Sequence, residues 1–162
     1  MCPGEQLIDA AKLGDLIAVR AAIRDGASPN YVDANGWMPL MWAAQEGHAK
    51  VVDHLLTAGA DPNFADENGC TPLKQAISWQ HVEVSEKLIL NGADVNCRSR
   101  ADGHSTPLHT AAAYGLLESI ELLRQYGADA CAKDDDGKTP YDVAIECGEV
   151  DAALVLRSAG MA

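Results

Sequence analysis

The stretch "TPLHTAAAYG", residues 106–115, decides the fold because related phrases recur along the whole chain. These phrases begin at Met38, Thr71 and Thr139, and the prolines of the four phrases are 33, 35 and 33 residues apart. A second series with the same spacing consists of the glycines Gly26, Gly59, Gly92, Gly127 and Gly160. Two independent markers with one period, about 33 residues, predict a protein built from structural repeats.

Each repeat is predicted to be a pair of short helices followed by an extended finger. A threonine before proline, as in Thr71-Pro72, is a helix start, because the hydroxyl caps free amides and proline loses no needed N–H. Small alanines follow, and a turn that usually contains glycine leads into a second helix. This second helix carries a Val/Leu stripe, as in residues 51–56, and ends at a glycine of the second series.

One turn between paired helices departs from this pattern. Gln80 stands where the other repeats have glycine, directly after the large aromatic residue Trp79. We expect Gln80 to adopt a positive φ, with more backbone strain than its glycine counterparts.

The repeated residues resemble the ankyrin repeat, in particular "TPLH" at 106–109, "GADPN" at 59–63 and "GADVN" at 92–96. The resemblance covers about residues 5–160 and implies an all-α fold, an ankyrin-repeat solenoid of five stacked helix-turn-helix repeats with β-hairpin fingers. The expected organisation is a single domain, 1–162, with repeats at about 5–30 (N-terminal cap), 31–63, 64–96, 97–131 and 132–162 (C-terminal cap). The first repeat is expected to lack the proline and the finger, and the acidic last repeat to end at Gly160.

The composition fits a folded array with an acidic surface. Hydrophobic residues make up 48% and charged residues 22% of the chain, which argues against wholesale disorder. The net charge is −12, and its acids are spread along the chain. Because Lys and Arg form no cluster in the sequence, we do not expect a nucleic-acid partner. An acidic field favours partners with a basic surface.

The cysteines and the N-terminal sequence indicate an intracellular protein. There are five cysteines at wide spacing with no CxxC pair, so neither a disulfide framework nor a zinc knuckle is predicted. The sequence shows no signal peptide and no apolar run that could span a membrane. We therefore expect a monomer in the cytoplasm, or also in the nucleus, without a membrane association.

No enzyme motif is present in the sequence. The chain lacks a P-loop, GxGxxG, HExxH and GxSxG, so no catalytic residue, cofactor or metal is predicted. His104 and Cys97 would supply only two metal ligands, which is too few for a convincing site. The resemblance implies that the TPLH histidine, His109, hydrogen-bonds within its own repeat and to the neighbouring repeat.

Asn63 and Asn96 stand at the bases of fingers, and two roles are open for them. In some eukaryotic ankyrin proteins an asparaginyl hydroxylase modifies an asparagine in a Leu…Asp-x-Asn context, which both residues resemble. The alternative is structural, an asparagine that caps the finger by bonding to local backbone.

The resemblance implies that a partner protein binds the finger tips and the exposed face of the first helices, the concave surface. The repeat register predicts that this surface includes Trp37, Glu46, Cys70, Trp79 and Tyr114. Trp37, Glu46, Trp79 and Tyr114 are expected to form one contiguous patch, and exposed aromatic residues of this kind often dominate binding. Trp42, by contrast, is expected to pack against the core of the first helices.

The finger of the fourth repeat, "CRSRADGHST" at 97–106, is two residues longer than the others. It carries Arg98, Arg100 and His104, which we include among the candidate binding residues. A finger that breaks a repeat rule is often part of the binding surface, but a loop tip also tolerates a neutral insertion, and both interpretations are open.

The leading hypothesis is a non-catalytic protein–protein interaction module, an adaptor, scaffold or inhibitor, whose partner presents a basic or an apolar surface. The second hypothesis is a targeting subunit of an enzyme complex, or a pathogen effector acting on host proteins.

Overall fold

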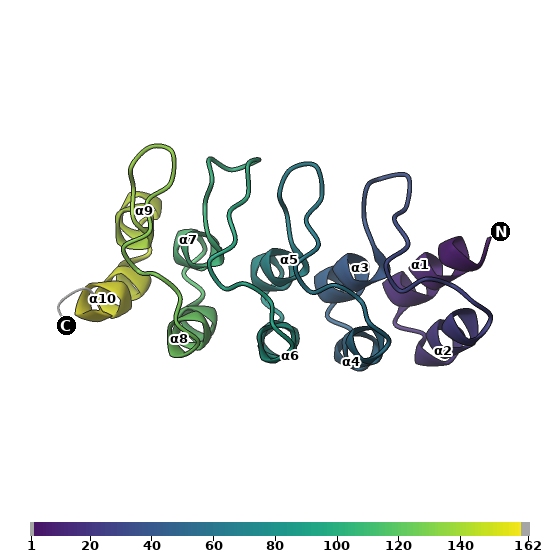
Figure 1. The fold of residues 1–162 in the computed structure, drawn as a ribbon. Coiled ribbons are helices and arrows are strands. Elements are labelled where there is room, and N and C mark those ends of the chain that lie inside the picture. Colours follow the sequence, from purple (N-terminus) through teal and green to yellow (C-terminus); the bar gives the residue numbers. More distant parts are fainter. Residues whose placement is uncertain (1, 160–162) are drawn as a thin grey trace. The chain divides into compact units, whose positions relative to one another are not determined.

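The computed structural model describes residues 2–159, and these residues form ten helices arranged as five pairs (Figure 1). The helices are α1 (Pro3–Leu13), α2 (Leu16–Arg24), α3 (Pro39–Gln45), α4 (Ala49–Thr57), α5 (Pro72–Ser78), α6 (Val82–Leu90), α7 (Pro107–Ala113), α8 (Leu117–Gln125), α9 (Pro140–Cys147) and α10 (Val150–Ala159). The prediction of an all-α fold built from helix pairs is confirmed. Gly160, the predicted end of the last helix, lies outside the described residues.

The chain divides into two compact units. The first unit contains residues up to Glu67 together with Thr71–Ala93, and so holds α1 to α6. Within it α3 packs between α1 and α5, and α4 packs between α2 and α6. The second unit contains Asn68–Cys70 and the chain from Asp94 onward, and in it α7 packs against α9 and α8 against α10. Helix pairs therefore stack side by side within each unit.

Alanines make this close stacking possible. Ala43 and Ala44 of α3 and Ala76 of α5 are fully buried in the first unit. Ala111 and Ala112 of α7 are fully buried in the second. Because these side chains are small, the first helices of successive repeats can approach closely, and leucines fill the remaining core.

Most first helices begin as the sequence predicts. The Thr71 side chain accepts a hydrogen bond from the N–H of Lys74, and Thr139 caps α9 in the same way. Met38 occupies the equivalent position before α3 and provides no side-chain cap. Gln80 has a φ of 62°, so the positive φ expected at this turn is confirmed.

The N-terminal repeat does not lack a proline start, and that expectation was wrong. α1 begins at Pro3, and Cys2 caps it. The Glu5 N–H donates to the Cys2 sulfur at 3.4 Å, while the Cys2 N–H donates to the Glu5 carboxylate at 2.8 Å. This reciprocal cap satisfies two free donors at the helix start, which is why the helix extends two residues before the predicted boundary.

The fingers are hairpin turns closed by few backbone hydrogen bonds. In the first unit the Asp33 N–H donates to the Trp37 carbonyl at 2.8 Å. In the second unit the Asp134 N–H donates to the Lys138 carbonyl at 3.0 Å. An isolated antiparallel bridge joins Ser99 to Ser105 in the longest finger. No residue between 2 and 159 belongs to a β-strand. Among the same residues, no helix combines the length and the apolar character needed to cross a membrane.

Candidate functional site

Asp33 organises the first finger and joins it to α3. Its carboxylate accepts hydrogen bonds from the N–H groups of Asn35 at 2.8 Å and Trp37 at 3.0 Å. The other carboxylate oxygen accepts from the indole N–H of Trp42 at 2.9 Å. One aspartate therefore fixes both the turn and two tryptophans.

The two tryptophans form a tilted pair at the base of this finger, with an angle of 48° between the ring planes. Their ring centroids are 4.5 Å apart, and the Lys12 ammonium lies 3.9 Å from the centroid of the Trp42 ring. The indole N–H of Trp37 donates to Asp66 at 3.1 Å. Trp42 is half-buried, and its contacts with Trp37, Asp33 and Lys12 of α1 are structural, as expected of a residue that packs against the first helices. Met38 and Met41 fill the core, and Trp42 turns toward Asp33 because its N–H needs an acceptor.

The hydrogen bonds of Asp33 predict a dependence of stability on pH. Partial burial raises the pKa of Asp33, but hydrogen bonds from Trp37, Trp42 and Asn35 outweigh it and bring the pKa below its ordinary value of 3.8. The ionised carboxylate therefore stabilises the fold at pH values above about 4, and this stabilisation is lost as the pH falls through the lowered pKa. We expect the Asp33→Asn variant to unfold at a lower temperature than the wild type at neutral pH. This difference in unfolding temperature should become smaller in acid.

Thermal unfolding, followed by circular dichroism from neutral pH to below about pH 4, measures the difference in unfolding temperature between the two proteins. Asp9→Asn is the control, because Asp9 is an exposed residue of the same unit that has no hydrogen bond or ion pair among the described residues. A constant gap between Asp33→Asn and the wild type at all pH values would contradict the prediction.

Three candidate binding residues occupy one structural position, the C-terminal end of a first helix. Glu46 ends α3 and Trp79 ends α5 in the first unit, and Tyr114 ends α7 in the second. Glu46 is exposed, and the exposed fractions of Trp79 and Tyr114 are 58% and 64%. Trp37 belongs to the same predicted patch but is half-buried in the tryptophan pair. That all four residues form one contiguous surface stays a prediction.

The long finger is bound to the finger that follows it. The Arg98 guanidinium donates to the backbone carbonyls of Lys133 at 2.7 Å and His104 at 3.3 Å. The His104 ring nitrogen Nδ1 lies 2.9 Å from the Asp135 carboxylate, and the Asp135 N–H donates to the Gly103 carbonyl at 2.9 Å. Two of the three binding candidates in this finger thus make contacts that hold the second unit together.

The remaining candidates in this region differ in exposure. Arg100 is exposed, and its side chain makes no hydrogen bond among the described residues, although its backbone N–H donates to the Asn68 carbonyl at 2.8 Å. Cys70 is half-buried. Among the three binding candidates of this finger, Arg100 is therefore the one whose side chain is not engaged by another described residue.

No metal centre is assembled within residues 2–159. The described side chains contain no group of three or more His, Cys, Asp or Glu residues that could hold a metal ion. His104 faces Asp135, as described above.

The asparagines at the finger bases connect one repeat to the next. The side-chain N–H groups of Asn30, Asn63 and Asn96 donate to the carbonyls of Gly59, Gly92 and Gly127, at 3.0, 2.8 and 3.4 Å. These glycines follow the second helix of the next repeat. The structural role considered for Asn63 and Asn96 thus takes another form, because these side chains bond to the backbone of the next repeat and not to local backbone.

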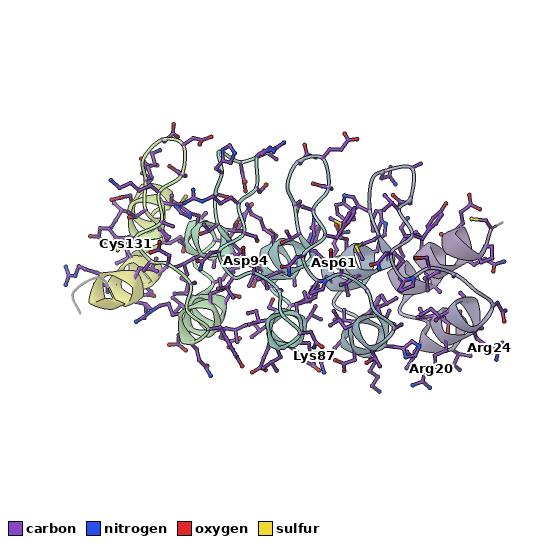
Figure 2. All side chains as sticks on the ribbon, viewed as in Figure 1. Arg20, Arg24, Asp61, Lys87, Asp94 and Cys131 are labelled. Carbon is purple, nitrogen blue, oxygen red and sulfur yellow. The ribbon has the colours of Figure 1, made fainter. Side chains whose placement is uncertain are left out.

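Neighbouring aspartates, and not the asparagines, accept the local backbone bonds at the finger bases. Asp61 accepts from the backbone N–H of Asn63, and Asp94 does the same for Asn96, so the asparagine side chains are released toward the next repeat. Figure 2 labels Asp61, Asp94 and Cys131 near the finger bases. Both asparagines are exposed, and their hydroxylation stays a prediction that an intact-mass measurement on protein from the native source would test.

Histidines provide a second set of bonds between repeats. His109 is buried, its Nδ1 lies 2.8 Å from the Thr106 hydroxyl, and its Nε2–H donates to the Lys138 carbonyl at 3.0 Å, which confirms the role that the resemblance implied. His81 Nε2–H donates to the Gln45 carbonyl of the preceding repeat at 2.8 Å. The ring of His81 can lie there because Gly47 has no side chain.

The repeat pattern did not indicate a basic pocket on the second helices. Arg20 on α2 and Lys50 and His54 on α4 line a cavity of about 340 Å³. The sequence signal for it is the absence of acids from residues 16–24 in an otherwise acidic chain.

Comparison with known proteins agrees with this architecture. The family model "Ankyrin repeats (3 copies)" matches residues 7–99 and 86–161. The chain is 50% identical over 40 residues to Rabankyrin-5 of Mus musculus, which covers 25% of this chain and 3% of that protein. It is 47% identical over 49 residues to ARF GTPase-activating protein GIT2 of Mus musculus, covering 30% of this chain and 7% of that protein.

A longer match is to the E3 ubiquitin-protein ligase Ufd4 of Drosophila melanogaster, 36% identical over 163 residues. It covers 96% of this chain but 4% of that protein, so the chain spans only a small part of the length of the relatives it matches. The family model matches nearly all of the described residues, and the helix pairs, fingers and TPLH histidine contacts agree with it: the chain belongs to the ankyrin repeat family.

Proposed function

We propose that the chain is a non-catalytic protein-interaction module, an adaptor, scaffold or inhibitor. Ankyrin repeats are in general protein–protein interaction modules. The observation that carries the proposal here is Trp79, whose indole is 58% exposed at the end of α5. An exposed tryptophan is costly to leave in water and is among the residues that contribute most to protein interfaces.

The surroundings of Trp79 support a partner with a basic or an apolar surface. Glu46 occupies the equivalent position of the neighbouring helix α3 and is exposed, and the chain as a whole has a net charge of −12. Acidic groups beside an exposed aromatic favour partners that bring Lys or Arg together with apolar side chains. In the second unit, Tyr114 and Arg100 are exposed candidates for contact with a partner.

Trp79→Ala is expected to weaken binding of the partner by about 2 kcal/mol, because truncation removes a large apolar contact at an interface centre. The partner is first identified by affinity purification from the native cell with mass spectrometry, and its affinity is then measured by calorimetry. Leu90→Ala is the matched control, because Leu90 is 65% exposed at the end of a second helix, outside the proposed surface. A folded Trp79→Ala variant that binds every partner as tightly as the wild type would disprove the proposed surface.

A second candidate function is a targeting part of an enzyme assembly. The names of two relatives, an E3 ubiquitin-protein ligase and an ARF GTPase-activating protein, support this proposal, since each includes an ankyrin-like segment. A pathogen effector that binds host proteins would use the same surface. Recovery of an enzyme among the proteins that Trp79→Ala no longer captures would favour the targeting role.

A further inference from the structure

The first unit contains a pocket on the face of the second helices, apart from the surface proposed above. It has a volume of about 340 Å³ and is lined by Leu16, Arg20, Lys50, Asp53, His54 and Thr57. Figure 1 shows α2 and α4 side by side on the side of the first unit away from the fingers. A ligand in this pocket would therefore leave Trp79 and the finger tips accessible.

The pocket has an excess of positive charge. The side chains of Arg20, Lys50 and His54 make no hydrogen bond or ion pair with any other residue that the structure describes. The acid in the lining, Asp53, accepts a hydrogen bond from the Lys87 ammonium at 2.7 Å, so its charge is already balanced. Figure 2 shows Arg20 of α2 and Lys87 of α6 on the side of the unit that the second helices form. Arg20 and Lys50 are thus two unpaired cations at one hollow of a chain whose net charge is −12.

The geometry points to a site for a phosphate monoester. A guanidinium binds two phosphate oxygens through its fork of N–H groups, an ammonium adds a mobile point charge, and an imidazole N–H donates a further bond. Arg20, Lys50 and His54 supply these three donor types from two adjacent helices. A phosphate monoester has three acceptor oxygens for these donors, whereas a carboxylate has two and would leave more of the donors unused.

The rest of the lining fits the group to which the phosphate is attached. Leu16 gives the pocket an apolar wall, and the carbon stems of Arg20 and Lys50 can pack against carbon atoms of the ligand. The Thr57 hydroxyl already donates to the Asp53 carbonyl at 2.8 Å, so it does not compete for the anion. The cavity exceeds the size of the phosphate group alone, and it accommodates a phosphorylated side chain of a peptide or a small phosphorylated metabolite.

Titration of the ¹⁵N-labelled protein, followed by NMR, tests the site with three probes: inorganic phosphate, a phosphoserine peptide and the same peptide without phosphate. We expect saturable shifts in α2 and α4 with the first two probes and none with the third. Tighter binding of the phosphopeptide would identify a peptide side chain as the source, and equal binding would identify a free phosphorylated molecule.

Arg20→Gln is expected to weaken phosphate binding about tenfold, since it removes a charge-assisted pair of hydrogen bonds. Arg24→Gln is the matched control, because Arg24 lies on the same helix outside the pocket, is paired with Asp25, and its replacement removes the same charge. Equal weakening by both substitutions would show a general attraction of α2 for anions and overturn the proposed pocket. The absence of any saturable response to phosphate would overturn it as well. Neither outcome depends on Trp79, so the test is separate from that of the interaction surface.

Discussion

Leu88→Ala is expected to lower the free energy of unfolding by about 3 kcal/mol. Leu88 lies in α6 and is fully buried, so its truncation removes apolar contacts and leaves a cavity that the packed helices cannot fill. Val84 and Ser85 are buried on the same helix, so Leu88 belongs to a packed face of α6. Urea denaturation followed by circular dichroism measures the change.

Leu154→Ala provides the comparison for Leu88→Ala. Leu154 lies in α10 and is 53% exposed, so we expect a loss of about 0.5 kcal/mol or less. The same chemical change is thus made at a buried and at an exposed position of a second helix. Equal losses for the two variants would contradict a core that lies between stacked helix pairs.

Gly47→Ala is expected to cost about 3 kcal/mol, as much as the loss of a core leucine. Gly47 has a φ of 75°, where a side chain adds about 1 kcal/mol of strain. A β carbon at this position would also come within 2.6 Å of the His81 ring. The ring would have to move and so lose its bond to the Gln45 carbonyl, at a further cost of about 2 kcal/mol.

Gly36→Ala separates these two causes. Gly36 has nearly the same φ, 78°, but a β carbon there would meet no atom within 4 Å. We therefore expect only the backbone strain, about 1 kcal/mol, in thermal or urea unfolding. If the two variants lose the same stability, the contact between repeats at His81 does not contribute, and the prediction for Gly47 fails.

Helix pairs could be predicted from the sequence because their signals are local. Thr71-Pro72 predicts a helix start without reference to any distant residue, and α5 begins at Pro72. Gln80 could be assigned a positive φ from its register alone, since the equivalent turns contain glycine. Both cases rest on backbone geometry that the repeat imposes on whichever residue occupies the position.

Side-chain directions between repeats could not be predicted in the same way. One role open for Asn63 was a bond to local backbone, but its side-chain N–H donates to a carbonyl 29 residues away. The repeat period alone does not show which backbone carbonyl lies within reach of this side chain. The register of Trp42 indicated that it packs against the first helices, but it did not show that Asp33 accepts its indole N–H. The basic pocket was missed for a related reason, because Arg20 and His54 belong to different repeats and meet only in the fold.

The bonds from asparagine and histidine side chains to the next or preceding repeat have a consequence for the order in which the chain folds. Those of Asn30, His81 and His109 join positions 29, 36 and 29 residues apart, so each closes a loop of about one repeat. Short loops cost little entropy to close and favour fast folding. During synthesis, each of these bonds can form once one further repeat has left the ribosome, without waiting for the remainder of the chain.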